Sequence, residues 1–287
     1  MTDPSQRDRK VQRVILIEGS ANVAVLIAKV GVGLSTGSLA ILGDAIHSLT
    51  DVINNIVAWF VTRLSSQPPD REHPYGHRKF ETLAVFFLAS LLVVLSFELA
   101  LHAINKEETV IASSSLELGI MFAVLITNIS VSSWQRMWAR RLKSDILFAD
   151  ASHTFADVLI TTAVIIGWQL SAMGYAWLDR ACALAVALLV FYLAFSLFKR
   201  AIPILVDKYA LDPELLSKAI EGVTGVQHIN RIRSRWVGHE KAVDIVISVD
   251  PNLSTDDSHE ITTTIESLIK QKFGVSDISV HVEPFAE

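Results

Sequence analysis

Two segments of this sequence carry the same pattern of ionisable side chains. DAIHSLTDV and DASHTFADV each place a histidine four residues before an aspartate, which gives the pairs His47/Asp51 and His153/Asp157. Residues four apart on a helix lie on the same face, one turn from each other. Two such helices facing each other would offer two imidazoles and two carboxylates, enough for a tetrahedral metal site. The alternative is that these side chains join helices by hydrogen bonds or extend toward water from the helix ends.

Both motifs lie inside long apolar stretches. Six stretches are each long enough to cross a hydrocarbon core of roughly 30 Å, which takes about 20 helical residues. They are Val14–Gly33, Leu39–Arg63, Thr82–Ile104, Leu116–Met137, Ile146–Ala172 and Trp177–Phe198. The second and the fifth contain the motifs. Because a carboxylate near the middle of a bilayer costs at least about 2.5–3.5 kcal/mol, ionisable groups in matched pairs favour a metal site over the alternative.

Other ionisable residues in these stretches allow more than one interpretation. Asp44 and Asp150 lie one turn before the two histidines, on the same face. They are either ligands at the approach to the site or solvated groups near the helix ends. Glu18 and Lys29, in the first stretch, return to one helical face. We expect both to look into the bundle and to join helices.

The composition is that of a membrane protein. Of the 287 residues, 51% are hydrophobic and 19% are charged, and the mean hydropathy is +0.41. These values exclude a disordered protein and argue against an ordinary soluble enzyme. The net charge of −5 lacks the basic footprint of a nucleic-acid-binding protein. The single cysteine, Cys182, excludes a disulfide framework or a thiolate metal cluster.

The distribution of positive charge predicts the orientation. Lys and Arg are concentrated before the first apolar stretch and after the second, fourth and sixth, whereas the opposite connections hold almost none. Since positive residues favour the cytoplasmic side, we predict that both termini are cytoplasmic. The first stretch is full length and is interrupted by Glu18, so no cleavable signal peptide is needed. We expect a multi-pass protein of the bacterial inner membrane.

From Asp207 onward the chain has the composition of a small soluble domain. A helix begins at Pro213 and ends at Gly222 or Gly225. The later elements are strands over Ile229–Val237 and Ala242–Val249, a helix from Ser254 to about Phe273, and a last strand through Ile278, Val280 and Val282. This order predicts an α+β domain with a helical layer on one sheet face. The predicted fold is an all-α six-helix transmembrane bundle over residues 1–206 and a cytoplasmic α+β domain over residues 207–287.

A further group of possible ligands lies between the second and third apolar stretches. Asp70, His73 and His77 fall within one short connection, on the side predicted to be cytoplasmic. Together they could chelate one divalent ion at the membrane surface. The alternative is an ordinary solvated loop.

Taken together, these features resemble the cation diffusion facilitator family of metal/proton antiporters. The resemblance runs from about Val11 to Pro284 and rests on the H-S-L-T-D and H-T-F-A-D pairs, the H-P-Y-G-H loop, the six helices and the α+β tail. It implies a transport site of His47, Asp51, His153 and Asp157 and a loop site of Asp70, His73 and His77. A His/Asp arrangement on both helices resembles zinc-transporting members, whereas members favouring manganese or iron more often replace the histidine of the second helix. The resemblance thus implies Zn²⁺ as the transported ion.

The resemblance also implies a homodimer with a metallochaperone-like tail that binds further metal ions. The matching tail residues are His228, Asp244, His259, His281 and Glu283. Val246 stands where some zinc-binding members carry a histidine, which counts against a cluster of two metal ions. An ion pair between Lys79 and Asp207, near the membrane surface, is implied to act as a hinge that fixes the dimer.

The donor chemistry connects metal transport to protons. Zn²⁺ accepts nitrogen and oxygen donors in a tetrahedron, and its binding requires neutral histidines and ionised aspartates, so metal and protons compete for the same atoms. We therefore expect Zn²⁺/H⁺ antiport out of the cytoplasm, with efflux of Fe²⁺, Mn²⁺ or Cd²⁺ by the same mechanism as the alternative. An intramembrane metalloprotease would need an H-E-x-x-H motif, which this sequence lacks, so we expect no enzymatic activity. An alternative of another class is a membrane-bound metal sensor that reads cytosolic ions through its tail.

Overall fold

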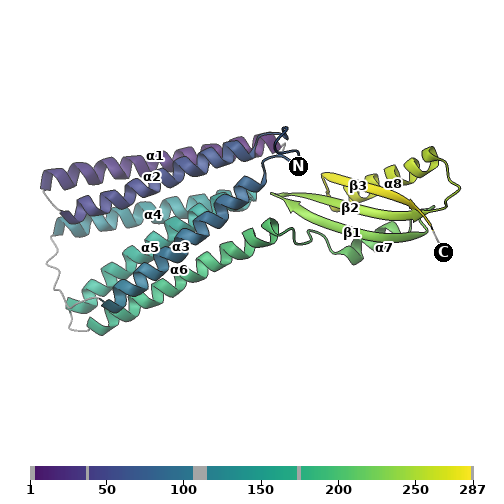
Figure 1. Cartoon of the computed structure of the whole chain (residues 1–287). Coiled ribbons are helices and arrows are strands. Elements are labelled where there is room, and N and C mark those ends of the chain that lie inside the picture. Colours follow the sequence, from purple (N-terminus) through teal and green to yellow (C-terminus); the bar gives the residue numbers. More distant parts are fainter. Residues whose placement is uncertain (1–3, 37–38, 106–114, 173–175, 286–287) are drawn as a thin grey trace. The chain divides into compact units, whose positions relative to one another are not determined.

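Two compact units make up the chain in the computed structural model (Figure 1). Their bounds are Met1–Ala201 and Ile202–Glu287. The structure describes residues 4–36, 39–105, 115–172 and 176–285. Within these ranges the first unit is helical, and the second combines a three-stranded sheet with two helices.

Six long helices are present among the described residues before the sheet. They are α1 (Pro4–Thr36), α2 (Leu39–Ser65), α3 (Lys79–Asn105), α4 (Ser115–Leu142), α5 (Asp145–Ala172) and α6 (Ala176–Leu205). Each contains one predicted apolar stretch and extends beyond it at one end or both. The reason is that an apolar stretch marks only the part of a helix that needs a nonpolar solvent, whereas the backbone hydrogen bonds continue into the polar turns.

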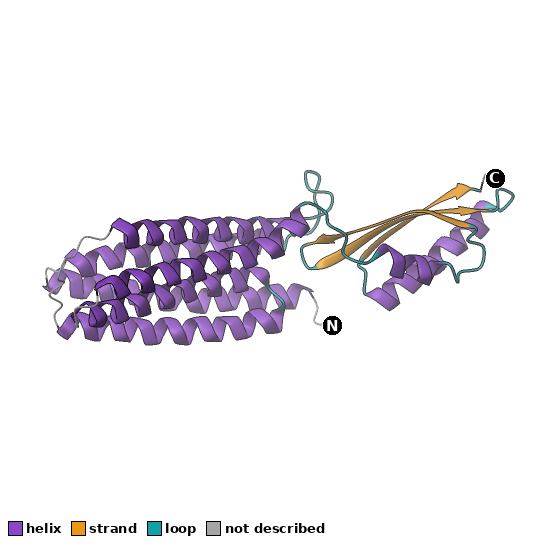
Figure 2. Ribbon diagram, turned by 90° about the horizontal axis from the view of Figure 1, so that it is seen from below, coloured by secondary structure: helices purple, strands orange, loops and turns teal. Residues whose placement is uncertain are grey.

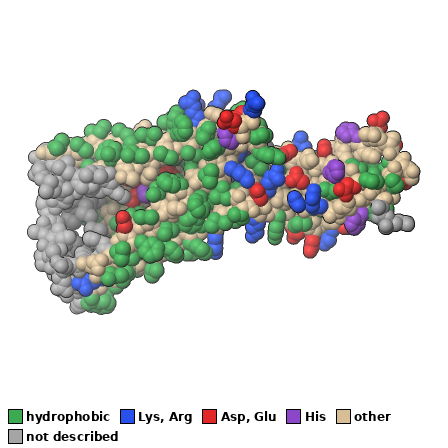
Figure 3. Space-filling model, in the orientation of Figure 1, with side chains coloured by type: hydrophobic (Ala, Val, Ile, Leu, Met, Phe, Trp, Pro, Cys, Tyr) green, Lys and Arg blue, Asp and Glu red, His purple; other side chains and the backbone are tan. Residues whose placement is uncertain are grey.

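The surface of the helical unit is apolar. Three segments of the described residues are long and apolar enough to cross a membrane, judged by length and composition: Gln6–Gly31, Lys79–Asn105 and Arg180–Leu205. Hydrophobic side chains cover much of this unit in Figure 3, and Ile27 and Leu188 are 66% and 71% exposed. Large apolar patches of this kind suit contact with lipid better than contact with water. Membrane crossing by α2, α4 and α5 stays a prediction.

The bundle is built from packed helix pairs. α1 packs along α2 and α4 packs along α5, while α3 contacts α2 and α5, and α1 also contacts α4. α6 is joined through Phe198, whose ring meets the ring of Phe86 edge-on, with 5.0 Å between centroids. The core includes Ile15, Leu92 and Leu197, which are fully buried. The two helices that carry the His/Asp motifs, α2 and α5, therefore rest mainly on other helices.

The second unit has the predicted order of helix, strand, strand, helix and strand. Its elements are α7 (Pro213–Ile220), β1 (His228–Val237), β2 (Glu240–Val249), α8 (Thr255–Phe273) and β3 (Asp277–Pro284). β2 lies in the centre, antiparallel to β1 and parallel to β3. The parallel pairing needs a crossover connection, and α8 provides it. α7 ends at Ile220, before either glycine that was predicted to end it.

Both helices of this unit pack on the same face of the sheet, as Figure 2 shows. Leu216 and Ile220 of α7 and Ile265 of α8 are fully buried with Ile245 and Ile247 of β2. Because side chains alternate along a strand, the other face of β2 points away from this core. The predicted α+β fold with a single helical layer is confirmed.

Candidate metal centre

Three of the four predicted transport-site residues come together from two helices. Asp51 lies on α2, His153 and Asp157 lie on α5, and one potential ligand atom of each lies within 4.8 Å of the others. His153 Nε2 is 3.3 Å from Asp51 Oδ1, and these two side chains are only 12% and 20% exposed. One imidazole nitrogen and two carboxylates around a common centre form a donor set for a divalent metal ion.

The fourth predicted ligand, His47, lies on α2 one turn before Asp51. Its side chain is outside the described residues, as is that of Asp44. The described part of the site therefore offers three donors. Metal ligation by the complete set stays a prediction.

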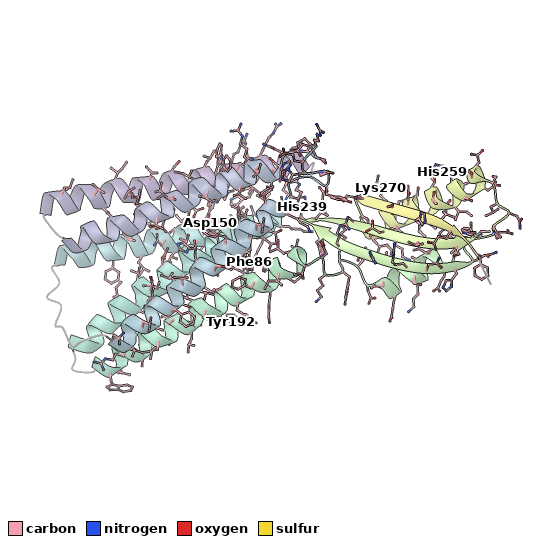
Figure 4. The ribbon with its side chains drawn as sticks, viewed as in Figure 1. Phe86, Asp150, Tyr192, His239, His259 and Lys270 are labelled. Carbon is pink, nitrogen blue, oxygen red and sulfur yellow. The ribbon has the colours of Figure 1, made fainter. Side chains whose placement is uncertain are left out.

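A second polar group lies one turn before His153 on α5. Asp150 is 4% exposed, so the alternative of a solvated group near a helix end does not apply to it; Figure 4 labels it among the helices. Gln135 of α4 donates through Nε2 to Asp150 Oδ2 at 2.7 Å and also to Glu18 Oε2 of α1. We call Glu18, Gln135 and Asp150 the acidic cluster. It connects three helices next to the predicted transport site.

The residues expected to look into the bundle are buried. Glu18 is 1% exposed and Lys29 is 5% exposed. Lys29 Nζ donates to Ser48 Oγ at 2.8 Å, which joins α1 to α2 as the sequence suggested. Gln135, in contrast, was missed. The only signal for it was an uncharged polar residue within the fourth apolar stretch.

The loop between α2 and α3 gathers a second set of donors. Potential ligand atoms of Asp70, His73 and His77 also lie within 4.8 Å of one another. Asp70 Oδ1 is 3.3 Å from His73 Nδ1, and Asp70 Oδ2 is 3.3 Å from His77 Nε2. The convergence of these atoms fits chelation better than it fits an ordinary solvated loop. Metal binding there stays a prediction.

The backbone of this loop holds Asp70 in place. Its Oδ1 accepts the N–H of Glu72 at 2.9 Å and that of His73 at 2.6 Å. Gly76 closes the turn by donating its N–H to the carbonyl oxygen of His73 at 2.9 Å, with a φ of 80° that favours glycine. The backbone N–H donors, above all that of His73, hold the pKa of Asp70 below its ordinary value. Asp70 therefore stays an ionised ligand to lower pH than an ordinary aspartate.

A buried ion-pair network, which sequence reasoning missed, anchors the loop. Asp8 of α1 accepts Arg7 Nη1 at 3.0 Å and Arg78 Nη1, from the end of the loop, at 2.7 Å. Arg7 also donates to the carbonyl oxygens of Leu142 and Lys143 at 2.9 and 3.0 Å. The network thus ties together α1, the loop and the end of α4. Its partners are distant in the sequence, and no local spacing could indicate them.

The predicted tail residues do not form one cluster within the chain. His228 and Glu283 both pair with Ser248 of β2, and His281 Nε2 is 3.9 Å from Glu283 Oε1, so these three lie on one sheet face. His259, labelled in Figure 4, lies on α8, which covers the opposite face. In the described part of the tail, no three donors converge as they do in the transport site and the loop.

The remaining tail candidates already have partners. Asp244 Oδ2 is 3.3 Å from Arg235 Nη1. Glu283 Oε2 accepts Asn230 Nδ2 at 2.6 Å. Metal ions that use these carboxylates would have to displace both contacts, and metal binding by the tail stays a prediction.

The predicted Lys79–Asp207 bridge would join the two units. Lys79 is the first residue of α3. Asp207 follows the end of α6 and has a φ of 52°. The bridge stays a prediction.

Comparison with known proteins gives matches over nearly the whole chain. The family model of the cation efflux transmembrane domain matches residues 15–206, and that of the cation efflux protein cytoplasmic domain matches residues 212–285. The manganese efflux system protein MneP of Bacillus subtilis is 31% identical and covers 99% of this chain and 99% of its own length. The cation-efflux pump FieF of Salmonella newport is 28% identical and covers 96% of this chain and 93% of its own length.

One solved structure, MamM-CTD 215-293, is 27% identical over 25% of this chain and 92% of its own length, with a TM-score of 0.24 that supports no conclusion. The transmembrane-domain model alone accounts for well over half of the chain. The identity with MneP extends that relationship through the tail. The chain therefore belongs to the cation diffusion facilitator family of cation efflux transporters.

Proposed function

We propose that the chain exports a divalent metal cation, with Zn²⁺ as the first candidate, in exchange for protons. The observation that carries this proposal is the convergence of Asp51, His153 and Asp157 from α2 and α5. With His47 from the sequence, the site has two nitrogen and two oxygen donors, a set that suits Zn²⁺. Membership of a cation efflux family supports transport as the role of this site.

Coupling to protons follows from the contact between His153 and Asp51. With Nε2 and Oδ1 only 3.3 Å apart, a protonated imidazole pairs with the carboxylate, whereas a metal ion needs the imidazole neutral. One pair of atoms therefore holds either a proton or the metal. Alternating exposure of the site to the two sides of the membrane would convert this competition into exchange. Protons from the more acidic side would release the ion there.

The rest of the chain serves this transport in the same proposal. Residues 1–206 form the transport domain in the bacterial inner membrane, with both termini in the cytoplasm. Residues 207–287 form a cytoplasmic domain that joins two chains as a homodimer, and the match to the cytoplasmic domain of cation efflux proteins supports this role. We assign no enzymatic reaction to the chain. Light scattering of the purified protein would measure the mass, and a monomer would contradict the dimer.

Mn²⁺ is the second candidate ion. The observation that favours it is the similarity to MneP and MneS of Bacillus subtilis, both named manganese efflux system proteins, at 31% and 26% identity. His47 argues for Zn²⁺ instead, since imidazole suits zinc better than it suits manganese. Fe²⁺ and Cd²⁺ are further alternatives within the same mechanism.

Metal uptake into reconstituted vesicles under a pH gradient tests the proposal. Zn²⁺, Mn²⁺ and Fe²⁺ are compared in the parent chain, in Asp157→Asn and in the control Asp145→Asn. Asp145 is at the start of the same helix, where it pairs with Arg200 at the surface. We expect gradient-dependent Zn²⁺ flux in the parent and in Asp145→Asn, and a loss of at least tenfold in Asp157→Asn.

Each other result changes a specific part of the proposal. Mn²⁺ flux exceeding Zn²⁺ flux would keep the site and overturn the choice of ion. Flux that persists in Asp157→Asn would refute the assignment of the site. Zn²⁺ flux that neither responds to the pH gradient nor moves protons in the opposite direction would refute proton exchange. A parent chain that binds metal but transports none would favour the membrane-bound sensor.

A further inference from the structure

The acidic cluster places two buried carboxylates against a single amide group. Glu18 is 1% exposed and Asp150 is 4% exposed. Both accept hydrogen bonds from Gln135 Nε2, and no Lys or Arg of the described residues bonds to either carboxylate. Two acidic groups that touch the same nitrogen in a buried place need a shared proton or a cation between them, because burying two like charges is very costly.

Two oxygen atoms of this cluster lack any partner. Gln135 is completely buried, yet its Oε1 has no hydrogen bond among the described residues, and neither has Oε1 of Glu18. A buried polar atom without a partner lowers stability, because it has lost its hydrogen bonds to water and gained none in return. The Gln135 amide already lies against both carboxylates through Nε2. A half-turn of its terminal torsion, which is a soft twofold rotation, exchanges Nε2 and Oε1 and presents an oxygen to both.

We infer that Glu18, Gln135 and Asp150 form a second cation site, which holds a divalent ion beside the transport site. In the ion-free cluster the Gln135 amide donates to the two carboxylates. When an ion enters, the amide turns and Oε1 joins the carboxylate oxygens as a ligand. The resulting donor set contains oxygen only, which suits hard divalent ions such as Mn²⁺. The transport site, with its imidazoles, suits Zn²⁺ better, so the two sites differ in preference.

The position of the cluster gives the second site a role. Asp150 precedes His153 by one helical turn on α5, toward the helix end formed by Asp145. The connection before that end carries the Lys and Arg residues that predict a cytoplasmic side. An ion coming from that side reaches the acidic cluster before it reaches the transport site. This role, unlike the existence of the site, rests on the proposed direction of transport.

Counting bound Mn²⁺ by electron paramagnetic resonance tests the site. The full chain in detergent is titrated with Mn²⁺, and the parent is compared with Glu18→Gln, Asp51→Asn and the double variant. Glu98→Gln is the matched control, since it makes the same substitution at an exposed position of another long helix, α3. The loop and tail donors are common to all five proteins, so their contribution cancels.

We expect Glu18→Gln to lose one bound Mn²⁺ per chain, Asp51→Asn to lose another, the double variant to lose both, and Glu98→Gln to lose none. The further loss between Glu18→Gln and the double variant also shows that the first substitution leaves the transport site folded. A Glu18→Gln protein that binds as much Mn²⁺ as the parent overturns the second site. A double variant that loses no more than Asp51→Asn alone also overturns it, because the cluster then only supports the transport site.

The outcome is independent of the flux experiment. Loss of one Mn²⁺ in Glu18→Gln supports the second site even where the parent chain transports no metal. Conversely, the count of bound Mn²⁺ can refute the second site even when the parent chain shows the expected Zn²⁺ flux. The two proposals therefore fail separately.

Discussion

Replacing Asp8 by asparagine tests how much the buried network at the loop contributes to stability. The Asp8 side chain is 7% exposed and accepts from two guanidinium groups, at 3.0 Å from Arg7 and 2.7 Å from Arg78. Asparagine keeps the shape but removes the charge that pairs with both, and leaves Arg7 with Glu81 Oε1 at 3.7 Å from its Nη2. Removing one partner of a buried ion pair costs about 3–5 kcal/mol. Arg78 is 15% exposed and Arg7 keeps two carbonyl acceptors, so we expect a smaller cost, about 2–4 kcal/mol.

Asp145→Asn is the control for this substitution. Asp145 pairs with Arg200 at 2.9 Å, but the two side chains are 40% and 47% exposed, so we expect a cost of about 0–1 kcal/mol. The assay is denaturant unfolding of the full chain in detergent, followed by tryptophan fluorescence, which gives the difference in unfolding free energy. Equal costs for the two substitutions, or a larger cost for Asp145→Asn, would refute the argument that burial sets the value of these ion pairs.

Two further predictions concern the loop and the tail. The backbone N–H of His73 lowers the pKa of Asp70. The Asp70 carboxylate therefore stabilises the loop at pH values above its unfolded-state pKa, and this contribution is lost as the pH falls through the lower folded-state pKa. The measurement is a carbon NMR titration of Asp70, and a midpoint at or above about 3.9 contradicts the prediction. Gly225 has a φ of 96°, and a Cβ there would lie 2.5 Å from Ile261 Cδ1, so we expect Gly225→Ala to cost about 1–3 kcal/mol in denaturant unfolding. Gly222→Ala is the control, because nothing lies within 4 Å of the added carbon, and it should change the stability by less than about 0.5 kcal/mol. Similar costs at both glycines would argue against backbone strain and a clash with Ile261 as the cause of the loss at Gly225.

The elements were predictable because hydrophobic periodicity is local information. Every apolar stretch lies within one helix, and the alternation in the tail gave the strands in the right order. The same local rule placed His153 and Asp157 on one face of α5, where the structure finds them together. The spacing inside the Asp70–His77 loop likewise corresponds to a real convergence of side chains.

The contacts that were missed join residues far apart in the chain. Gln135 and Glu18 are 117 positions apart, and Arg78 and Asp8 are 70 apart. A single sequence shows that each residue is polar but not which helix it faces. The role of Asp150 stayed open for the same reason, since periodicity gives its face on α5 but not the depth or the neighbour. In the tail, the sheet register and the position of α8 separate His259 from His281, and neither could be read from spacing.

The division of the predicted ligands between α2 and α5 also bears on how such a transporter can diversify. Each of these helices packs mainly against a different partner, α2 against α1 and α5 against α4. The contacts within each pair are apolar or involve polar residues other than the predicted ligands. In the proposed site, a substitution at His153 alters the donors offered to the ion and the contact with Asp51, and leaves the apolar core between the helices in place. Under the proposed function, the choice of exported ion is therefore separable from the fold: it resides in a few side chains, while the packed helix pairs that carry them are inherited unchanged.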